Sequence, residues 1–295
     1  MKAIAVRNLN RNFGALQALK DFTLDVEKGS VMGLIGPNGA GKTTFIRLLA
    51  GLIAPDSGTI NIMEEDILNR EPEYRQNIGF VPEECQLYDY MTLEDLFSFV
   101  RGFYREWNSE LVARYTESFG LPSGTRIGNY SRGMKAKASL ILALAHNPDI
   151  LVLDEPTSGL DPIFRREFLN VIMEEMILEG KTVLFSSHII DDVERIADQV
   201  AIINRGRLVK VRPMDELKSN EKKIRVVFQK MPEEDFFSYP GIENVENQGS
   251  AYIITVADNF EEIYKMCKDR PHYALEIIER SLEDILINTA EENRK

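Results

Sequence analysis

The chain has 295 residues, 44% of them hydrophobic and 28% charged, which is typical of a globular protein with room for more than one domain. Its net charge of −12 disfavours binding to the phosphate backbone of a nucleic acid but permits a local basic pocket for a small anion. The two cysteines, Cys85 and Cys267, are too few for a disulfide framework, and with three histidines they do not complete the usual ligand set of a zinc site.

At the N-terminus, residues 1–10 lack the long apolar region of a secretory signal. No apolar run along the chain approaches the ~20 residues that span a bilayer. We therefore expect no intrinsic membrane span, and any role at a membrane must depend on a partner chain.

Residues 1–220 predict an α/β domain. Residues 22–27 alternate apolar and polar side chains, as in a half-buried strand. Short continuous apolar runs, typical of strands in a sheet covered on both faces, occupy residues 31–35, 78–81, 150–153, 183–185 and 200–203. Helical spacing follows Thr92, which with Asp95 three residues on forms a variant of the capping box. A second helix starts at Asp161 and Pro162 and ends before Gly180. Residues 83–145 predict a helical insert without strands.

Residues 221–295 have a different pattern, joined to the first part by the polar stretch 218–223. Strands are expected at 224–228, around Val245, at 251–256 and at 274–278, with a weak helical turn at 233–237 and helices at 260–267 and 281–288. This β-α-β-β-α-β order resembles a ferredoxin-like unit. We expect a small α+β domain with core positions at Ile253, Ile263, Ile277, Leu282 and Leu286.

A glycine-rich loop directly follows the apolar run 31–35. Residues 36–44 read GPNGAGKTT and match G-x-x-x-x-G-K-[ST]. Its glycines let backbone N–H groups turn toward phosphate oxygens at a helix N-terminus, where Lys42 adds a positive charge and the Thr43 hydroxyl can ligate Mg²⁺. The expected nucleotide-binding residues here are Gly36, Pro37, Asn38, Gly39, Ala40, Gly41, Lys42, Thr43 and Thr44. A glycine-rich turn without a ligand is the alternative, which the order strand, loop and helix disfavours.

Two adjacent carboxylates end the apolar run 150–153. Burying Asp154 and Glu155 side by side is costly unless a cation or a reaction uses them. Asp154 can hold the Mg²⁺ of a bound nucleotide. If the backbone is extended, Glu155 points the other way and can act as general base toward an attacking water. Glu155 as a cap of the following turn is the alternative.

Together these motifs resemble the nucleotide-binding subunit of an ABC transporter, over about residues 1–220. The resemblance implies a P-loop cassette with a RecA-like core, an antiparallel β subdomain and a helical subdomain, which hydrolyses ATP with Mg²⁺. It also implies that Phe13 stacks on adenine, that residues 158–161 form the D-loop and that His188 contacts the γ-phosphate. Without the resemblance, a lone histidine at a strand end would be interpreted as structural.

Two motifs depart from the family pattern. The signature segment (residues 130–134) reads YSRGM in place of LSGGQ and retains Ser131 and Gly133, which the resemblance assigns to the γ-phosphate bound by the opposite subunit. A serine-capped core helix is the alternative. Glu83 replaces a glutamine that reaches Mg²⁺. A carboxylate also suits a hard cation but adds negative charge near Asp154, and Glu83 could instead be a solvated loop residue.

The resemblance further implies partners. A separate transmembrane permease subunit and a second ATPase subunit are expected, with a head-to-tail homodimer favoured because every motif is present, and with the chain peripheral at the cytoplasmic face of the membrane. Leu87, Tyr88 and Tyr90 either line a groove for the partner's coupling helix or belong to the core. Residues 221–295 either contact their twin in the dimer or cover an edge of the cassette.

Narrower similarity is to the ABC-2-type exporter subfamily, in its bacitracin-resistance, YtrB-like and amphipathic-peptide exporter groups. Export of a peptide or a lipid-like amphipathic substrate is therefore the hypothesis. The alternative is a soluble ABC ATPase that acts on the ribosome or on nucleic acid, although such proteins usually carry paired cassettes or long coiled-coil insertions. A third idea, a control subunit whose tail binds a regulator, is disfavoured by the intact Lys42, Asp154, Glu155 and His188.

Overall fold

The computed structural model describes residues 1–67, 72–220, 222–230 and 232–279. The chain divides into two compact units, Met1–Val211 and Arg212–Lys295. This division falls earlier than the boundary after residue 220 that the change in sequence pattern suggests, and it assigns helix α7 (Met214–Asn220) to the second unit. Among the described residues, no helix combines the length and the apolar character that crossing a membrane requires.

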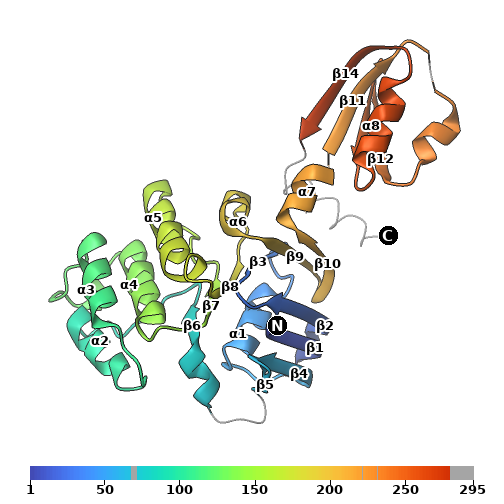
Figure 1. The fold of residues 1–295 in the computed structure, drawn as a ribbon. Helices are drawn as coiled ribbons and strands as arrows, with labels where there is room; N and C mark the ends of the chain where they lie inside the picture. The colour runs from blue at the N-terminus through green and yellow to red at the C-terminus, as the bar shows by residue number, and fades with distance from the viewer. Residues whose placement is uncertain (68–71, 221, 231, 280–295) are drawn as a thin grey trace. The chain divides into compact units, whose positions relative to one another are not determined.

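The centre of the first unit is a sheet with the strand order β10-β9-β3-β8-β7-β6 (Figure 1). Its strands are β3 (Val31–Ile35), β6 (Ile78–Val81), β7 (Ile150–Asp154), β8 (Thr182–Ser186), β9 (Gln199–Asn204) and β10 (Arg207–Pro213). Strand β3 pairs in parallel with β8 and β9, and β7 pairs in parallel with β6 and β8; β3, β7 and β8 are buried throughout. The expected apolar strands are thus confirmed. Because the strands are parallel, the segments that follow β3, β7 and β8 meet at one edge of the sheet.

A second, antiparallel sheet has the order β2-β1-β4-β5. It contains β1 (Lys2–Phe13), β2 (Leu16–Glu27), β4 (Ser57–Ile62) and β5 (Glu65–Asp66). Helix α1 (Lys42–Leu49) packs against it, with the rings of Phe22 and Phe45 4.6 Å apart, and one hydrophobic core joins this sheet to the central one. The sequence indicated residues 22–27 as a strand but not β1 or β4, in which register shifts interrupt the alternation of side chains.

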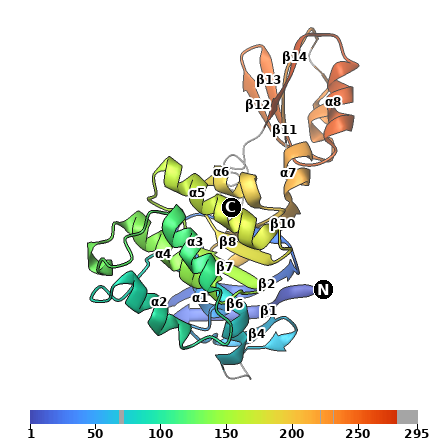
Figure 2. The same cartoon turned by 60° about the vertical axis from the view of Figure 1, so that its left-hand side comes forward.

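The expected helical insert lies between β6 and β7 and extends beyond the β6 end of the central sheet (Figures 1 and 2). It consists of α2 (Leu93–Arg101), α3 (Ser109–Ser118), η2 (Ile127–Asn129) and α4 (Arg132–Ala145). Thr92 and Asp95 form the predicted capping box of α2. The Tyr88 and Tyr90 side chains are 48% and 69% exposed, so these two residues are not part of a buried core.

The remaining helices of the first unit cover or flank the central sheet. They are η1 (Pro72–Asn77), α5 (Pro162–Ile172), which continues into the π-helical turn η3 (Met173–Ile177), and α6 (Ile190–Ile196). As the sequence predicts, Asp161 caps α5, accepting hydrogen bonds from the backbone N–H groups of Ile163 and Phe164, and Pro162 occupies its first position.

The second unit contains an antiparallel sheet of order β12-β13-β11-β14. Its elements are β11 (Lys222–Phe228), η4 (Glu234–Ser238), β12 (Ile242–Gln248), β13 (Ala251–Val256), α8 (Phe260–Lys268) and β14 (His272–Glu279). This is the strand order of a ferredoxin-like unit in which the first helix is reduced to a 3-10 turn. Ile263 is fully buried in its core, as predicted.

Two expected core positions of this unit are not buried in that core. Ile277 is 46% exposed, because β14 lies at the edge of the sheet and, among the described strands, pairs only with β11. Ile253 is half-buried and pairs with the exposed Arg225, away from the core cluster. The helix expected at 281–288, with Leu282 and Leu286, lies outside the described residues.

Candidate functional site

A cavity of about 740 Å³ lies where the segments following β3, β7 and β8 meet the β1–β2 hairpin. We call it the main cavity. It is lined by Phe13, Leu16, Gln17, Ala18, Asn38, Gly39, Ala40, Gly41, Lys42, Thr43, Thr44, Glu83, Glu155, Ser158, His188 and Arg205. The structure therefore brings together most of the residues that the sequence assigns to one site, although they come from five separate segments of the chain.

The loop between β3 and α1 requires glycine at two positions. A Cβ atom on Gly36 would lie 2.2 Å from the carbonyl oxygen of Ile203, and one on Gly41, whose φ is 110°, would lie 2.6 Å from that of Ala18. No larger residue fits either position without displacing backbone. The loop thus turns tightly, and α1 begins at Lys42 with its N-terminal N–H groups at the cavity wall.

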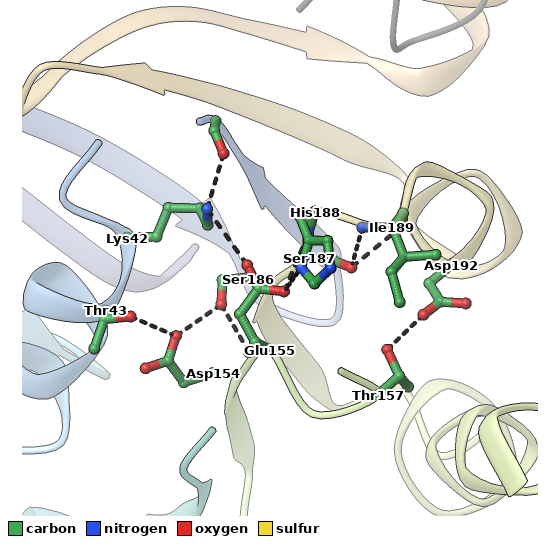
Figure 3. Close-up of polar contacts among 11 residues, drawn as sticks. Lys42, Thr43, Asp154, Glu155, Thr157, Ser186, Ser187, His188, Ile189 and Asp192 are labelled. Carbon is green, nitrogen blue, oxygen red and sulfur yellow. Dashed lines mark hydrogen bonds and ion pairs between the residues drawn. The ribbon is translucent and has the colours of Figure 1, made fainter. Parts of the chain in front are cut away.

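Lys42 is 6% exposed and has two partners (Figure 3). Its Nζ donates a hydrogen bond to the Gly36 carbonyl oxygen at 2.8 Å and lies 3.4 Å from Oε1 of Glu155. A buried ammonium and a buried carboxylate partly neutralise each other. A polyanion that enters the cavity meets an ammonium already held at its wall.

Asp154 ends β7 and is 2% exposed. Its Oδ1 accepts hydrogen bonds from the hydroxyls of Ser186 (2.8 Å) and Thr43 (3.2 Å). Burial raises the pKa of Asp154 above its ordinary value; the two hydroxyls oppose this, while the negative charges of Glu83 and Glu155 reinforce it. A nearby cation would therefore stabilise the ionised carboxylate.

This oxygen set fits Mg²⁺, which prefers carboxylate and hydroxyl oxygens and completes its shell with phosphate and water. Among the residues that the structure describes, no three His, Cys, Asp or Glu side chains gather into a complete metal site. The Asp154 carboxylate and the Thr43 hydroxyl would thus supply part of the ligand shell of such an ion. Glu83 lines the cavity and lies close enough for its charge to raise the pKa of Asp154.

Glu155 has a left-handed backbone, with φ of 45°. The sequence-based expectation of an extended backbone at this residue is wrong: the two carboxylates diverge because the chain turns, not because side chains alternate along a strand. Ser186 Oγ accepts a hydrogen bond from the Glu155 N–H at 2.9 Å and so holds this turn. A left-handed non-glycine residue is strained, and such strain is common at functional sites.

The Glu155 side chain is directed toward His188 as well as Lys42 (Figure 3). Oε2 accepts hydrogen bonds from His188 Nδ1 at 2.6 Å and from the His188 backbone N–H at 3.1 Å. Because the carboxylate only accepts, Nδ1 carries a hydrogen in this contact. The His188 side chain is 52% exposed and lines the main cavity. Glu155 is thus fixed between two donors, which is more than the capping of a turn requires.

The segment after Glu155 is anchored at a second point. Thr157 Oγ1 donates to Asp192 Oδ2 at 2.5 Å, and Asp192 also pairs with Arg165 at 2.9 Å. Burial raises the pKa of Asp192, while the Thr157 hydroxyl and Arg165 oppose the shift. Asp192 and Ser186 were not identified from the sequence; the serine pair before His188 was the available signal for Ser186. Arg205, in the turn between β9 and β10, had no local signal.

The expected residues of the signature segment do not line the main cavity. Ser131 is exposed and caps α4, its Oγ accepting a hydrogen bond from the Met134 N–H at 3.2 Å. At Gly133, an added Cβ would lie 3.2 Å from the ring of Phe164. The guanidinium of Arg132 lies over Gly159, where an added Cβ would come within 2.8 Å of Nη1. Within one chain, Ser131 and Gly133 are therefore separate from the loop 36–44.

Comparisons with known proteins identify the family to which the chain is similar. A sequence profile described as ABC transporter matches residues 19–158. The chain is 32% identical over 225 residues to the ABC transporter ATP-binding protein YtrB of Bacillus subtilis (strain 168), covering 76% of this chain and 77% of that protein. It is 34% identical over 222 residues to the bacitracin transport ATP-binding protein BcrA of Bacillus licheniformis, covering 75% and 72%. A solved ATP-binding subunit of an ABC transporter superposes with a TM-score of 0.67 at 30% identity, covering 73% of this chain and 92% of that one.

Proposed function

The chain belongs to the ABC transporter family as an ATP-binding subunit with ATPase activity, and we propose that it drives a separate transmembrane permease by forming a head-to-tail dimer on binding ATP. The main support is that Ser131 and Gly133 are outside the cavity that holds Lys42, Glu155 and His188. A second copy, placed head to tail, supplies the missing signature segment to each cavity.

The proposed roles follow from the contacts. The loop 36–44 and Lys42 bind the phosphates, and Phe13 stacks on the adenine. Glu155 accepts a proton from the water whose oxygen attacks the γ-phosphorus, the bond to ADP breaks, and phosphate leaves. Both oxygens of Glu155 are engaged by Lys42 and His188; when the phosphates attract the Lys42 ammonium, Oε1 becomes free to accept that proton.

Mg²⁺ is a proposed cofactor, held by Thr43, Asp154 and Glu83. When bound there, Mg²⁺ would offset the negative charge of the phosphates. Glu83→Gln tests the Glu83 assignment: we expect the Mg²⁺ concentration for half-maximal ATPase activity to rise about tenfold, because ligand charge sets divalent affinity. Glu84→Gln, at an exposed neighbour that does not line the main cavity, is the control. An unchanged Mg²⁺ titration would make Glu83 a solvated loop residue.

A permease partner is supported by the exposed aromatic cluster, which we define as Tyr88, Tyr90, Phe99 and Phe103. Their side chains are 42% to 69% exposed, yet successive rings lie 5.1 to 5.8 Å apart. Contiguous exposed aromatic surface is typical of a protein–protein contact. We propose that it receives a segment of the membrane subunit and so holds the chain at the cytoplasmic face of the membrane.

For the cargo, we propose a peptide or a lipid-like amphipathic molecule that is exported. The support is the similarity to a subunit named for bacitracin transport. The alternative, an ABC ATPase acting on the ribosome or on nucleic acid, is not favoured by these relatives, and the net charge of −12 disfavours a phosphate backbone. Cells in which this chain carries Lys42→Ala should export an amphipathic peptide of the bacitracin type more slowly than cells with the wild-type chain, and equal export would contradict the cargo assignment.

The nucleotide site is tested by Lys42→Ala, which should abolish measurable ATP binding. Lys2→Ala removes a surface ammonium paired with Asp25 and is the control. Unchanged ATP affinity in Lys42→Ala would contradict the phosphate-loop assignment.

The dimer is tested by Ser131→Ala, which should leave ATP binding to one chain intact but weaken ATP-dependent dimerisation in light scattering. Since the substitution also removes a helix cap, Thr92→Ala, which removes the cap of α2, is the matched control. Equal dimerisation in both variants would contradict the head-to-tail arrangement.

A further inference from the structure

The ring of Phe13 is covered on one face by a guanidinium. Cζ of Arg11 lies 4.8 Å from the ring centroid, the geometry of a cation–π contact. Phe13 is nevertheless 46% exposed and lines the main cavity. Its ring thus has support on one side and an accessible surface toward the cavity.

A single carboxylate holds the two residues that precede Phe13. Asp56, immediately before β4, pairs with Arg11 Nη1 at 2.9 Å. Its other oxygen accepts hydrogen bonds from the Asn12 backbone N–H at 2.6 Å and from Asn12 Nδ2 at 2.8 Å. These contacts, the Asn12 N–H first, hold the pKa of Asp56 below its ordinary value, so Asp56 stays ionised and keeps Arg11 in place.

The backbone around Arg11 departs from a regular strand. The pairing of β1 with β2 shifts register on both sides of Arg11, and such bulges change the direction of side chains. Arg11 Nε is buried and has no hydrogen-bond partner among the described residues, an unfavourable state for a donor. The contacts that hold the Arg11 guanidinium are therefore the ion pair with Asp56 and the ring of Phe13, and not a hydrogen bond from Nε.

We infer that Arg11 is a positioning residue for nucleobase recognition: together with Asp56 it supports Phe13 so that the free face of the ring is preset to stack on the base of a nucleotide in the main cavity. The inference rests on the proposed binding of ATP there. A ring that is already immobilised loses less freedom on binding, which strengthens stacking without any new contact to the ligand.

The test compares a ligand with a base and one without. Equilibrium affinities of the full-length chain for ATP and for inorganic tripolyphosphate, both with Mg²⁺, are measured for wild type, Arg11→Ala, Phe13→Ala and the double variant. We expect Phe13→Ala to weaken ATP binding on the order of tenfold and Arg11→Ala to weaken it about two- to fivefold. Tripolyphosphate affinity should be unchanged in both.

Two comparisons separate positioning from general damage. If Arg11 acts through Phe13, the double variant should bind ATP like Phe13→Ala alone. Arg7→Ala, which removes a surface arginine of β1 paired with Asp25, should change neither affinity. Equal losses for ATP and tripolyphosphate, additive losses in the double variant, or unchanged ATP affinity in Arg11→Ala would each overturn the inference. Failure of the wild type to bind ATP would instead overturn the proposed function.

Discussion

Nδ1 of His188 lies 2.6 Å from Oε2 of Glu155, while Oε1 of the same carboxylate lies 3.4 Å from Nζ of Lys42. Lys42, at the start of α1, and His188, in the loop after β8, therefore both contact the Glu155 carboxylate, which directly follows β7 and is 7% exposed. An ion pair on Oε1 and two hydrogen bonds on Oε2 fix its orientation. The position of the proposed base is thus set by the protein before substrate enters.

Glu155→Gln should slow ATP hydrolysis by ~10²–10⁴-fold, the usual contribution of a general base. ATP binding should persist, because glutamine has the same shape and leaves Lys42 and the loop 36–44 in place. Phosphate release and ATP affinity are measured on the same preparation. Glu167→Gln, which removes a carboxylate paired with Lys137 outside the cavity, should leave both unchanged. Near-normal turnover in Glu155→Gln would remove Glu155 from its role.

Asp154→Asn should stabilise the nucleotide-free protein at neutral pH. The folded-state pKa of Asp154 is raised, mainly by burial, so the unfolded chain ionises first as pH rises and stability falls across that window. Asparagine carries no charge and so removes this cost. We expect the free energy of unfolding to rise by ~1 kcal/mol, or Tm by a few degrees, as is typical of stabilising substitutions in active sites. The gain should shrink as pH falls toward about 4, where the unfolded carboxylate is also protonated.

Asp95→Asn is the control for the Asp154→Asn experiment, because it should change Tm in the opposite direction. The Thr92 hydroxyl and backbone N–H lower the pKa of Asp95, so its substitution should lower Tm at neutral pH, and the difference should fade in acid. The test is to measure Tm by thermal unfolding for the wild type and both variants between pH 4 and 7. A Tm for Asp154→Asn that does not depend on pH relative to wild type would refute the electrostatic explanation.

Gly159→Ala and Gly180→Ala form a matched pair for the D-loop. Both glycines have positive φ, 72° and 67°, so each substitution should cost ~1 kcal/mol of stability. At Gly159 the new Cβ would displace the Arg132 guanidinium, whereas at Gly180 no atom of the described residues lies within 4 Å of the new Cβ. Since Gly159 adjoins the cavity-lining Ser158, we expect ATPase activity to fall about tenfold or more in Gly159→Ala. Equal activities would show that the Arg132 contact has no catalytic relevance.

Truncation after Ser219 tests the role of the strands of the second unit. It removes β11 to β14 and leaves the core shared by the two sheets of the cassette intact. If residues 221–295 contact their twin in the second subunit, light scattering should show that the truncated chain no longer dimerises in the nucleotide-free complex with the permease. Addition of ATP should still restore the dimer. The same assembly and ATPase rate as the full chain would make the tail a cover of the cassette edge.

The central strands could be predicted because β3, β7 and β8 are buried on both faces and so consist of continuous apolar runs. Sequence motifs likewise indicated Lys42 and Glu155, and the family resemblance indicated His188, although the contacts among them depend on the parallel pairing of β7 with β8. Ser186 could not be assigned a role from the sequence. It joins Asp154 to the Glu155 backbone only because those two strands are neighbours, which is a property of the tertiary fold.

Irregular backbone and edge position explain why β1, the conformation of Glu155 and the exposure of Ile277 were not predicted correctly. Strand β1 shifts register several times against β2, which hides its alternation and re-aims Arg11 next to Phe13. The left-handed conformation of Glu155 also has no marker in the sequence, since it is enforced by Ser186 and by the partners of the carboxylate. Edge position explains Ile277: helical and strand periodicity identify apolar faces, but not whether a neighbour covers them.

The separation of Ser131 from its own cavity has a genetic consequence in the proposed dimer. A Glu155→Gln chain retains a sound Ser131, and a Ser131→Ala chain retains a sound cavity. Homodimers of either chain contain no complete site, but a mixed dimer contains one, made from the cavity of the second chain and the signature segment of the first. Two defective alleles expressed together should therefore complement each other, whereas one allele carrying both substitutions should act as a dominant inhibitor of the wild type.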